Sequence, residues 1–154
     1  MRTAGQGLTI VLAAMSMGAA APGAIRSAHA EAVVQADGAA FVAYYWRARP
    51  GRMQEYNDYI RRVAEPIDED ARRAGVVEEV RTVTPVTSPD APGPDWTHLR
   101  IFRLKDQAAV AQLGPGLDAA TVRVVPDEAQ RQTNTARSAG LRDLVRREVW
   151  TELK

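Results

Sequence analysis

A run of aromatic and β-branched residues, closed by a turn and followed by a long amphipathic pattern, constrains the fold of this chain most. The run FVAYYWRA at 41–48 is typical of a β-strand, and Pro50-Gly51 predicts a tight turn directly after it. Apolar residues then recur every three or four positions from Met53 to Ala74, with charged residues between them. This spacing predicts a helix that buries one side, so the fold is expected to begin with a strand, a turn and a helix.

Pro66 interrupts this helical pattern. Because proline lacks a backbone N–H, we expect a kink or a break near Ala64, with the helix restarting over 68–74 if it breaks. Four acidic residues surround the proline, and their spacing scatters them around a helix axis. We expect them on a solvated face rather than in a cation site: Glu65, Asp68, Glu69 and Asp70.

Two further strands are predicted at 76–85 and 95–104, and a proline-rich loop joins them. Side chains alternate along the second of these strands and form two sets. We expect one set to be core beneath helices: Thr97, Leu99 and Ile101. We expect the other set, in which a cation and an imidazole stand among aromatic rings, to line a pocket: Trp96, His98, Arg100 and Phe102.

The C-terminal third is predicted to add two helices and a strand. A short helix is expected at 105–113, ended by the Gly-Pro-Gly sequence at 114–116. Residues 117–126 fit either an extra strand or a loop docked over the sheet, and periodicity does not decide between them. A longer helix is expected from Pro126-Asp127 to Leu144, followed by a last strand at 146–153.

This order of elements, β-α-β-β-α-β, predicts an α+β domain of the ferredoxin-like plan, an antiparallel sheet with helices on one face. The other face of such a sheet is left bare. A bare face that carries aromatic residues exceeds the apolar patch that a monomer usually shows, so we expect a homodimer.

Composition removes several classes of function. The chain has 154 residues and no cysteine, which excludes disulfides, thiolate catalysis and cysteine-ligated metals. Its formal charge is +1 and no segment concentrates lysine and arginine, so we expect no nucleic-acid partner. No metal site is predicted.

Residues 1–30 have the layout of a secretory signal peptide. They begin with Arg2, continue through an apolar stretch and end at Ala28-His29-Ala30, a small-residue cleavage site. We therefore expect an exported protein, periplasmic or secreted, whose single domain spans 31–154 and which keeps no stable membrane anchor after cleavage. Cleavage would leave His98 as the only histidine.

The sequence resembles the dimeric α+β barrel superfamily, which includes antibiotic-biosynthesis-type monooxygenases and small exported bacterial proteins of uncharacterised role. Three segments carry the resemblance: 44–56, YYWRARPGRMQEY; 95–98, DWTH; and 147–150, REVW. The resemblance implies that two protomers press their sheets together into a barrel. It also implies a small hydrophobic ligand, or haem, inside the barrel or between sheet and helices.

No cofactor is predicted for this chain. The Asn, Trp and His set of the haem-degrading branch does not align with Asn57, Trp96 and His98, although the residue types are present. The expected partner is instead a small hydrophobic or aromatic molecule, in agreement with the aromatic residues of the first and third strands.

Six residues are candidates for the site. His98 and Arg100 are the candidate catalytic pair, since a neutral imidazole can take a proton and a guanidinium can stabilise the resulting anion. The candidate ligand-binding residues are aromatic: Tyr45, Tyr59, Trp96 and Phe102. Tyr59 and Asn57 lie at the edge of the buried helix stripe, where they could border a cleft. Structural roles for His98 and Arg100, including a salt bridge across a dimer, stay open.

Three functions agree with this reading. The protein could be an enzyme, such as a cofactor-independent monooxygenase in which His98 deprotonates a phenol-like substrate and Arg100 stabilises the anion. It could be a carrier or sensor that binds the same kind of molecule without converting it. It could also be a structural protein that works through its surface, because fold alone does not fix function.

Overall fold

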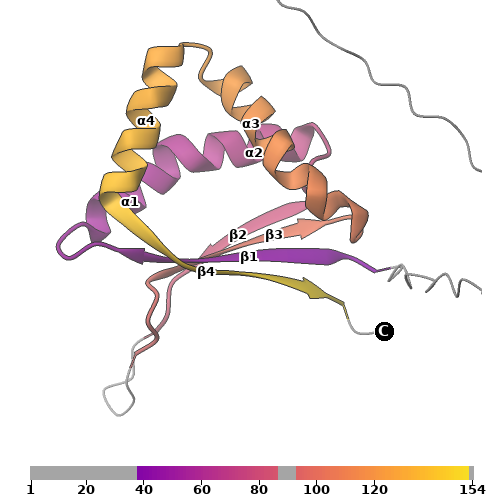
Figure 1. The fold of residues 1–154 in the computed structure, drawn as a ribbon, viewed down its shortest axis with the longest axis horizontal. Helices are drawn as coiled ribbons and strands as arrows, with labels where there is room; N and C mark the ends of the chain where they lie inside the picture. The colour runs from indigo at the N-terminus through magenta and orange to yellow at the C-terminus, as the bar shows by residue number, and fades with distance from the viewer. Residues whose placement is uncertain (1–37, 87–92, 153–154) are drawn as a thin grey trace, which may run out of the picture. The chain divides into compact units, whose positions relative to one another are not determined.

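The aromatic run at 41–48 forms the central strand of a four-stranded antiparallel sheet in the computed structural model, which describes residues 38–86 and 93–152. The strands are β1 (Ala40–Ala48), β2 (Glu79–Val83), β3 (His98–Leu104) and β4 (Arg142–Thr151), arranged in the order β2-β3-β1-β4 (Figure 1). The helices all lie on one face of this sheet. The predicted ferredoxin-like α+β fold is confirmed by this order. The predicted signal peptide lies outside the described residues.

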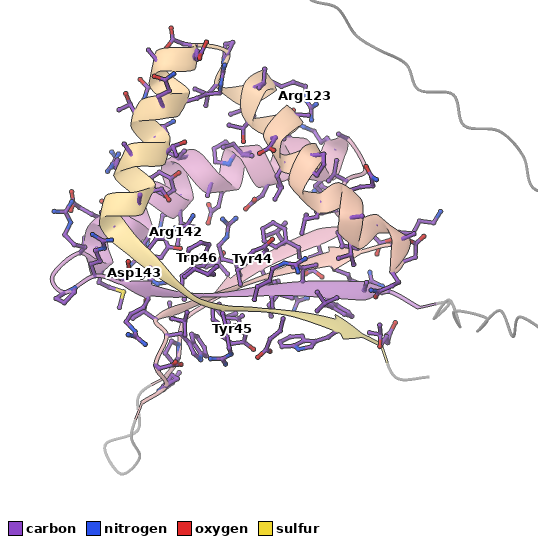
Figure 2. All side chains as sticks on the ribbon, viewed as in Figure 1. Tyr44, Tyr45, Trp46, Arg123, Arg142 and Asp143 are labelled. Carbon is purple, nitrogen blue, oxygen red and sulfur yellow. The ribbon has the colours of Figure 1, made fainter. Side chains whose placement is uncertain are left out.

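The strand register decides which side chains lie beneath the helices. Opposite residues of paired strands point to the same face, and β1 pairs with β3 so that Val42 faces Phe102 and Trp46 faces His98. Val42 and Phe102 belong to the main hydrophobic core, which the helices cover. Trp46 and His98 therefore also lie on the helix side. Tyr45 lies on the bare side, as Figure 2 shows.

The two faces of β3 are the reverse of the prediction. His98 and Phe102 are 1% and 3% exposed beneath the helices, whereas Leu99 and Ile101 are only half-buried on the bare face. Alternation in a sequence separates the two sets but does not say which set faces the helices. On β3, His98, Arg100, Phe102 and Leu104 face the helices, and Leu99 and Ile101 face outward.

The first helical region is continuous and changes its winding in the middle. It consists of α1 (Met53–Tyr59), a π-helical turn η1 (Ile60–Ala64) and α2 (Glu65–Arg73). The irregularity falls where Pro66 predicts it, but the helix resumes at Glu65 rather than at 68. Pro66 stands in the first turn of α2, a position that tolerates proline.

The π-helical turn keeps one side of this helix against the sheet. Four of its five buried residues follow one another at intervals of four, and Ala71 comes three residues later: Tyr56, Ile60, Ala64, Asp68 and Ala71. In a regular α-helix each four-residue step drifts by about 40° around the axis, so Asp68 would point away from the sheet. In the π turn the Glu65 N–H donates to the Ile60 carbonyl five residues back, and this wider winding offsets the drift.

The segment 105–127 differs most from the prediction. A 3₁₀ turn η2 (Ala108–Gln112) begins where the Asp106 side chain accepts a hydrogen bond from the Ala109 N–H, at 2.9 Å. The helix α3 (Leu113–Val124) then runs through the Gly-Pro-Gly sequence and through 117–124, so neither the helix end nor the extra strand or loop is found. Pro115 is tolerated because the first N–H groups of a helix have no helical partner.

The last helix passes directly into the last strand. In α4 (Glu128–Leu141) the Asp127 carboxylate accepts from the Gln130 N–H at 2.6 Å and caps the helix as predicted. The helix ends three residues before Leu144, and β4 begins at once at Arg142 rather than at 146. In the described ranges no helix is long and apolar enough to cross a bilayer.

Gly116 is required where α3 approaches the chain that leads into β2. A Cβ at this position would lie 2.3 Å from Cγ1 of Val76, whereas a Cβ at Gly114, two residues earlier in the same helix, would meet nothing within 4 Å. Gly116→Ala is therefore expected to lower the free energy of unfolding by about 1–3 kcal/mol, because the helix must move away from Val76. Gly114→Ala is the matched control and should leave stability unchanged or slightly higher. Urea unfolding of both variants checks this, and equal stabilities would show that the close approach is unimportant.

Candidate functional site

A group of polar side chains lies between the sheet and the helices, beside the hydrophobic core. The buried polar residues there are Asp68, His98, Arg100 and Ser138. Tyr56 and the half-buried Arg142 join them. Such groups are usually hydrogen-bonded, because an unpaired polar group costs about 1–3 kcal/mol away from water; among the described residues, Nε of Arg100 is the buried side-chain atom left without a partner. The partners define the candidate site.

His98 is held in its neutral form. Its Nε2 lies 2.8 Å from Oδ1 of Asn57 on α1, and its Nδ1 lies 2.8 Å from the hydroxyl of Thr97. Since an amide oxygen only accepts, Nε2 carries the proton and Nδ1 accepts from Thr97. Burial, with a smaller effect of the positive charge of Arg142, lowers the pKa of His98 to about 4. Both ring nitrogens are thus engaged at neutral pH.

Arg100 forms an internal ion pair with Asp68 of α2, and both side chains are about nine-tenths buried. Burial raises the pKa of Asp68, and the Arg100 guanidinium opposes this shift. The pair neutralises its own charge inside the protomer. Arg100 therefore needs no carboxylate from a second protomer to balance its charge. The expectation that Asp68 lies on a solvated face is wrong. The π-helical turn brings Asp68 to this position.

Arg142 lies at the junction of α4 and β4 and touches three side chains. Its Nη1 donates to the Tyr56 hydroxyl at 2.8 Å and its Nε donates to the Ser138 hydroxyl at 3.1 Å. The guanidinium carbon lies 3.6 Å from the centre of the Trp46 ring and 5.3 Å from that of Tyr56. Figure 2 shows Arg142 above Trp46 on the helix side of the sheet. Unlike Arg100, it forms no ion pair with a carboxylate of residues 38–86 or 93–152.

A cavity of about 390 Å³ opens beside Arg142. Its walls come from β1, the end of α1, α4 and the start of β4: Trp46, Tyr59, Thr135, Ser138, Ala139 and Arg142. Tyr44 stacks on Trp46 at 6.2 Å and meets Phe102 edge to face at 5.8 Å. The cavity thus combines aromatic walls, hydroxyl groups and one cation, which are the usual contents of a small-molecule site.

A second, smaller group of aromatic residues lies on the bare face. Tyr45 stands between Trp96 and Trp150, with ring centres 5.7 and 6.5 Å away. Its hydroxyl donates to Glu148 at 3.0 Å, and the Arg146 guanidinium lies 3.7 Å from its ring centre. A cavity of about 660 Å³ lies on the same face beside Trp150.

The six candidate residues are therefore divided between the two faces of the sheet. His98, Arg100 and Phe102 lie on the helix side, and Tyr59 lines the cavity beside Arg142. Tyr45 and Trp96 lie together on the bare face. The expectation that Trp96 shares a face with His98 is wrong, because β3 begins only at His98 and the alternation does not extend back to Trp96.

The edge positions predicted on the first helix are found. Asn57 lines a cavity of about 400 Å³ at the end of the sheet, together with Met53, Trp96 and Thr97. Sequence reasoning missed Tyr56, Asp68 and Arg142 as site residues. The four-residue spacing from Tyr56 to Asp68 was the signal for the first two, and no sequence signal marked Arg142 among the other arginines.

The described residues hold no group of three His, Asp or Glu side chains placed to ligate a metal. No family model matches the chain, and no curated protein matches it. The fold therefore has to be compared at the level of solved structures.

Several solved structures are similar in fold at very low identity. HapK from Hahella chejuensis is 9% identical over 74% of this chain and 92% of its own, with a TM-score of 0.49. An EthD family protein from Bacillus halodurans is 14% identical over 75% of this chain and 99% of its own, with a TM-score of 0.45. A dimeric ferredoxin-like protein of unknown function from Bacteroides fragilis is 12% identical over 77% of this chain and 97% of its own, with a TM-score of 0.45. These similarities say nothing about activity, and the fold assignment rests on this chain's own strand order.

The neutral state of His98 predicts a pH dependence of stability. Its folded-state pKa of about 4 lies below the ordinary value of 6.5, so on acidification the unfolded chain takes up the proton first. The free energy of unfolding should therefore fall between pH 6.5 and 4, by about 2 kcal/mol from pH 7 to pH 5 on account of this group.

His98→Gln is the variant to compare with wild type. It removes the titration of the imidazole and leaves the other titratable groups, such as Asp68, in place. Urea unfolding of both proteins at pH 7 and pH 5 measures the difference, and NMR of the imidazole gives the pKa directly. An identical pH dependence in the two proteins would contradict the buried neutral state.

Proposed function

We propose that this protein is a homodimer that binds a small hydrophobic or aromatic molecule between its sheet and its helices. The observation that carries the proposal is the cavity beside Arg142, in which Trp46 and Tyr59 provide aromatic walls. Its volume of about 390 Å³ lies in the range of small-molecule sites, roughly 300–1,000 Å³. The protein is proposed to be exported, and this stays a prediction from residues 1–30.

The contacts favour binding over turnover at His98. A general base must offer a free lone pair within reach of the proton that it removes. The Nδ1 lone pair of His98 already accepts from Thr97, and Nε2 donates to Asn57. Arg100 is neutralised by Asp68. The proposed role is therefore that of a carrier or sensor, and an oxygenase that used His98 would first have to break these hydrogen bonds.

The homodimer is supported by the bare face of the sheet. Apolar side chains that helices would otherwise cover lie on it: Phe41, Val83, Leu99, Ile101 and Trp150. Val83 and Trp150 are 42% and 38% exposed. Charged residues of both signs, including Arg81 and Glu79, surround them. A twofold contact needs such a self-complementary surface, so a second copy of this chain is the proposed occupant.

A second location for the ligand is favoured by one observation on the bare face. Tyr45 between Trp96 and Trp150, beside the cavity of about 660 Å³, could hold an aromatic molecule inside the barrel that two sheets enclose. This alternative places the ligand in the seam between protomers rather than beneath the helices of one protomer.

Two tryptophan variants test the location of binding. Trp46→Ala removes a wall of the cavity beside Arg142, and Trp150→Ala removes a ring of the same type from the bare face. Affinity for aromatic ligands such as 2-naphthoate, measured by calorimetry, is expected to fall at least about tenfold in Trp46→Ala and to be kept in Trp150→Ala. The reverse pattern would move the site to the barrel seam, and the absence of binding in wild type would refute the proposed function.

The dimer is tested by placing a charge on the bare face. Ile101→Glu is expected to give monomers, because burying a carboxylate between two sheets costs more than its pairing with Arg81, directly opposite on β2, would return. Val122→Glu, at an exposed apolar residue of α3, is the control and should stay dimeric. Light scattering after size exclusion gives the masses, and a monomeric wild type would contradict the shared barrel.

A further inference from the structure

The ligand class can be narrowed from the charges around the cavity, and this step rests on the proposed function. We infer that the molecule bound beside Arg142 is an aromatic carboxylate, a planar monoanion whose carboxylate pairs with Arg142 and whose ring lies against Trp46 and Tyr59. Arg142 is then the residue that determines specificity.

The charge balance beneath the helices is the first argument. Two guanidinium groups are buried or half-buried in this space, those of Arg100 and Arg142, while the exposed Arg147 lies at its edge, where it donates to the Tyr44 hydroxyl. Asp68 balances Arg100 within the protomer, and His98 is neutral. Over the part of the chain that the structure describes, no carboxylate balances Arg142. One positive charge is thus left over in a half-buried, aromatic setting, where an anion is attracted far more strongly than in water.

Arg142 is also held in place by its neighbours, while its Nη2 stays free to donate to a ligand. Tyr56 and Ser138 accept from Nη1 and Nε, and the Trp46 ring lies against the guanidinium plane. Within the described ranges Nη2 makes no hydrogen bond. An arginine held by neutral groups in this way is pre-organised for an outside acceptor, so little side-chain entropy is lost when the acceptor binds.

The shape and charge of a carboxylate match this guanidinium. A carboxylate is planar and accepts parallel hydrogen bonds from the Nη1 and Nη2 end of a guanidinium. Its single negative charge equals the charge of the half-buried Arg142, whereas a phosphate monoester would bring nearly two. The Thr135 and Ser138 hydroxyls of α4 line the same cavity and can donate further hydrogen bonds. Trp46 and Tyr59 require that the rest of the molecule be apolar and flat enough to stack.

The experiment compares 2-naphthoate with 2-naphthamide, which have nearly the same shape and differ in charge. Dissociation constants are measured by calorimetry on wild type, Arg142→Gln, Arg142→Lys and Arg137→Gln. Arg137 is an exposed arginine on α4, the helix that leads into Arg142, and is the matched control. Circular dichroism and thermal unfolding show whether each variant is folded.

Wild type and Arg137→Gln are expected to bind the carboxylate at least about tenfold more tightly than the amide, the size of one charge-assisted hydrogen bond. In Arg142→Gln this preference should disappear, with the amide bound as before. Arg142→Lys should keep part of the preference for the carboxylate. It keeps the positive charge but loses the paired N–H donors and the stacking of the guanidinium on Trp46.

The outcomes separate the two levels of the proposal. Equal binding of both compounds by wild type would overturn the inference and leave the proposed binding function standing. A preference for the carboxylate that survives in Arg142→Gln would also overturn it. Binding of neither compound by wild type would refute the proposed function and the inference together. If Arg142→Gln does not fold, the comparison in wild type and in Arg142→Lys still decides.

Discussion

The contact of Arg142 with Trp46, Tyr56 and Ser138 joins the elements that form the candidate site. It ties the first residue of β4 to β1, to α1 and to α4. The direct passage from α4 into β4 makes this possible, since no loop separates the buried Leu141 from Arg142. Because a guanidinium cannot lose its charge, every neighbouring group must accommodate a permanent cation. The positive charge of Arg142 adds to the effect of burial in keeping His98 neutral.

Most of the fold could be predicted from the sequence because periodicity and turn residues act locally. The order of elements, the antiparallel sheet and the position of the helix irregularity near Ala64 are found. The stretch 113–124 was not recognised as a helix, because glycine, proline and β-branched residues all disfavour helices. Packing outweighed that preference: Leu113 and Ala120 are fully buried, and Gly116 lets the helix approach Val76.

The candidate site was less predictable because it depends on contacts between distant residues. The sequence singled out His98 and Arg100 as candidates. It could not show that Asp68 neutralises Arg100, or that both ring nitrogens of His98 are hydrogen-bonded, to Asn57 and Thr97. It also joined Trp96 to His98, although the strand begins too late for them to share a face. Arg142 became visible only once α4 and β4 were placed against Trp46.

A crystal structure of the protein with 2-naphthoate tests the central claim most directly, because it shows where and how an aromatic anion binds. The carboxylate is expected within hydrogen-bond distance of the Arg142 Nη2, with the ring between Trp46 and Tyr59. A naphthoate found instead on the bare face, between Trp150 and Ile101, would contradict the assignment of the site. An empty cavity at saturating ligand would contradict the claim that Arg142 recruits an anion.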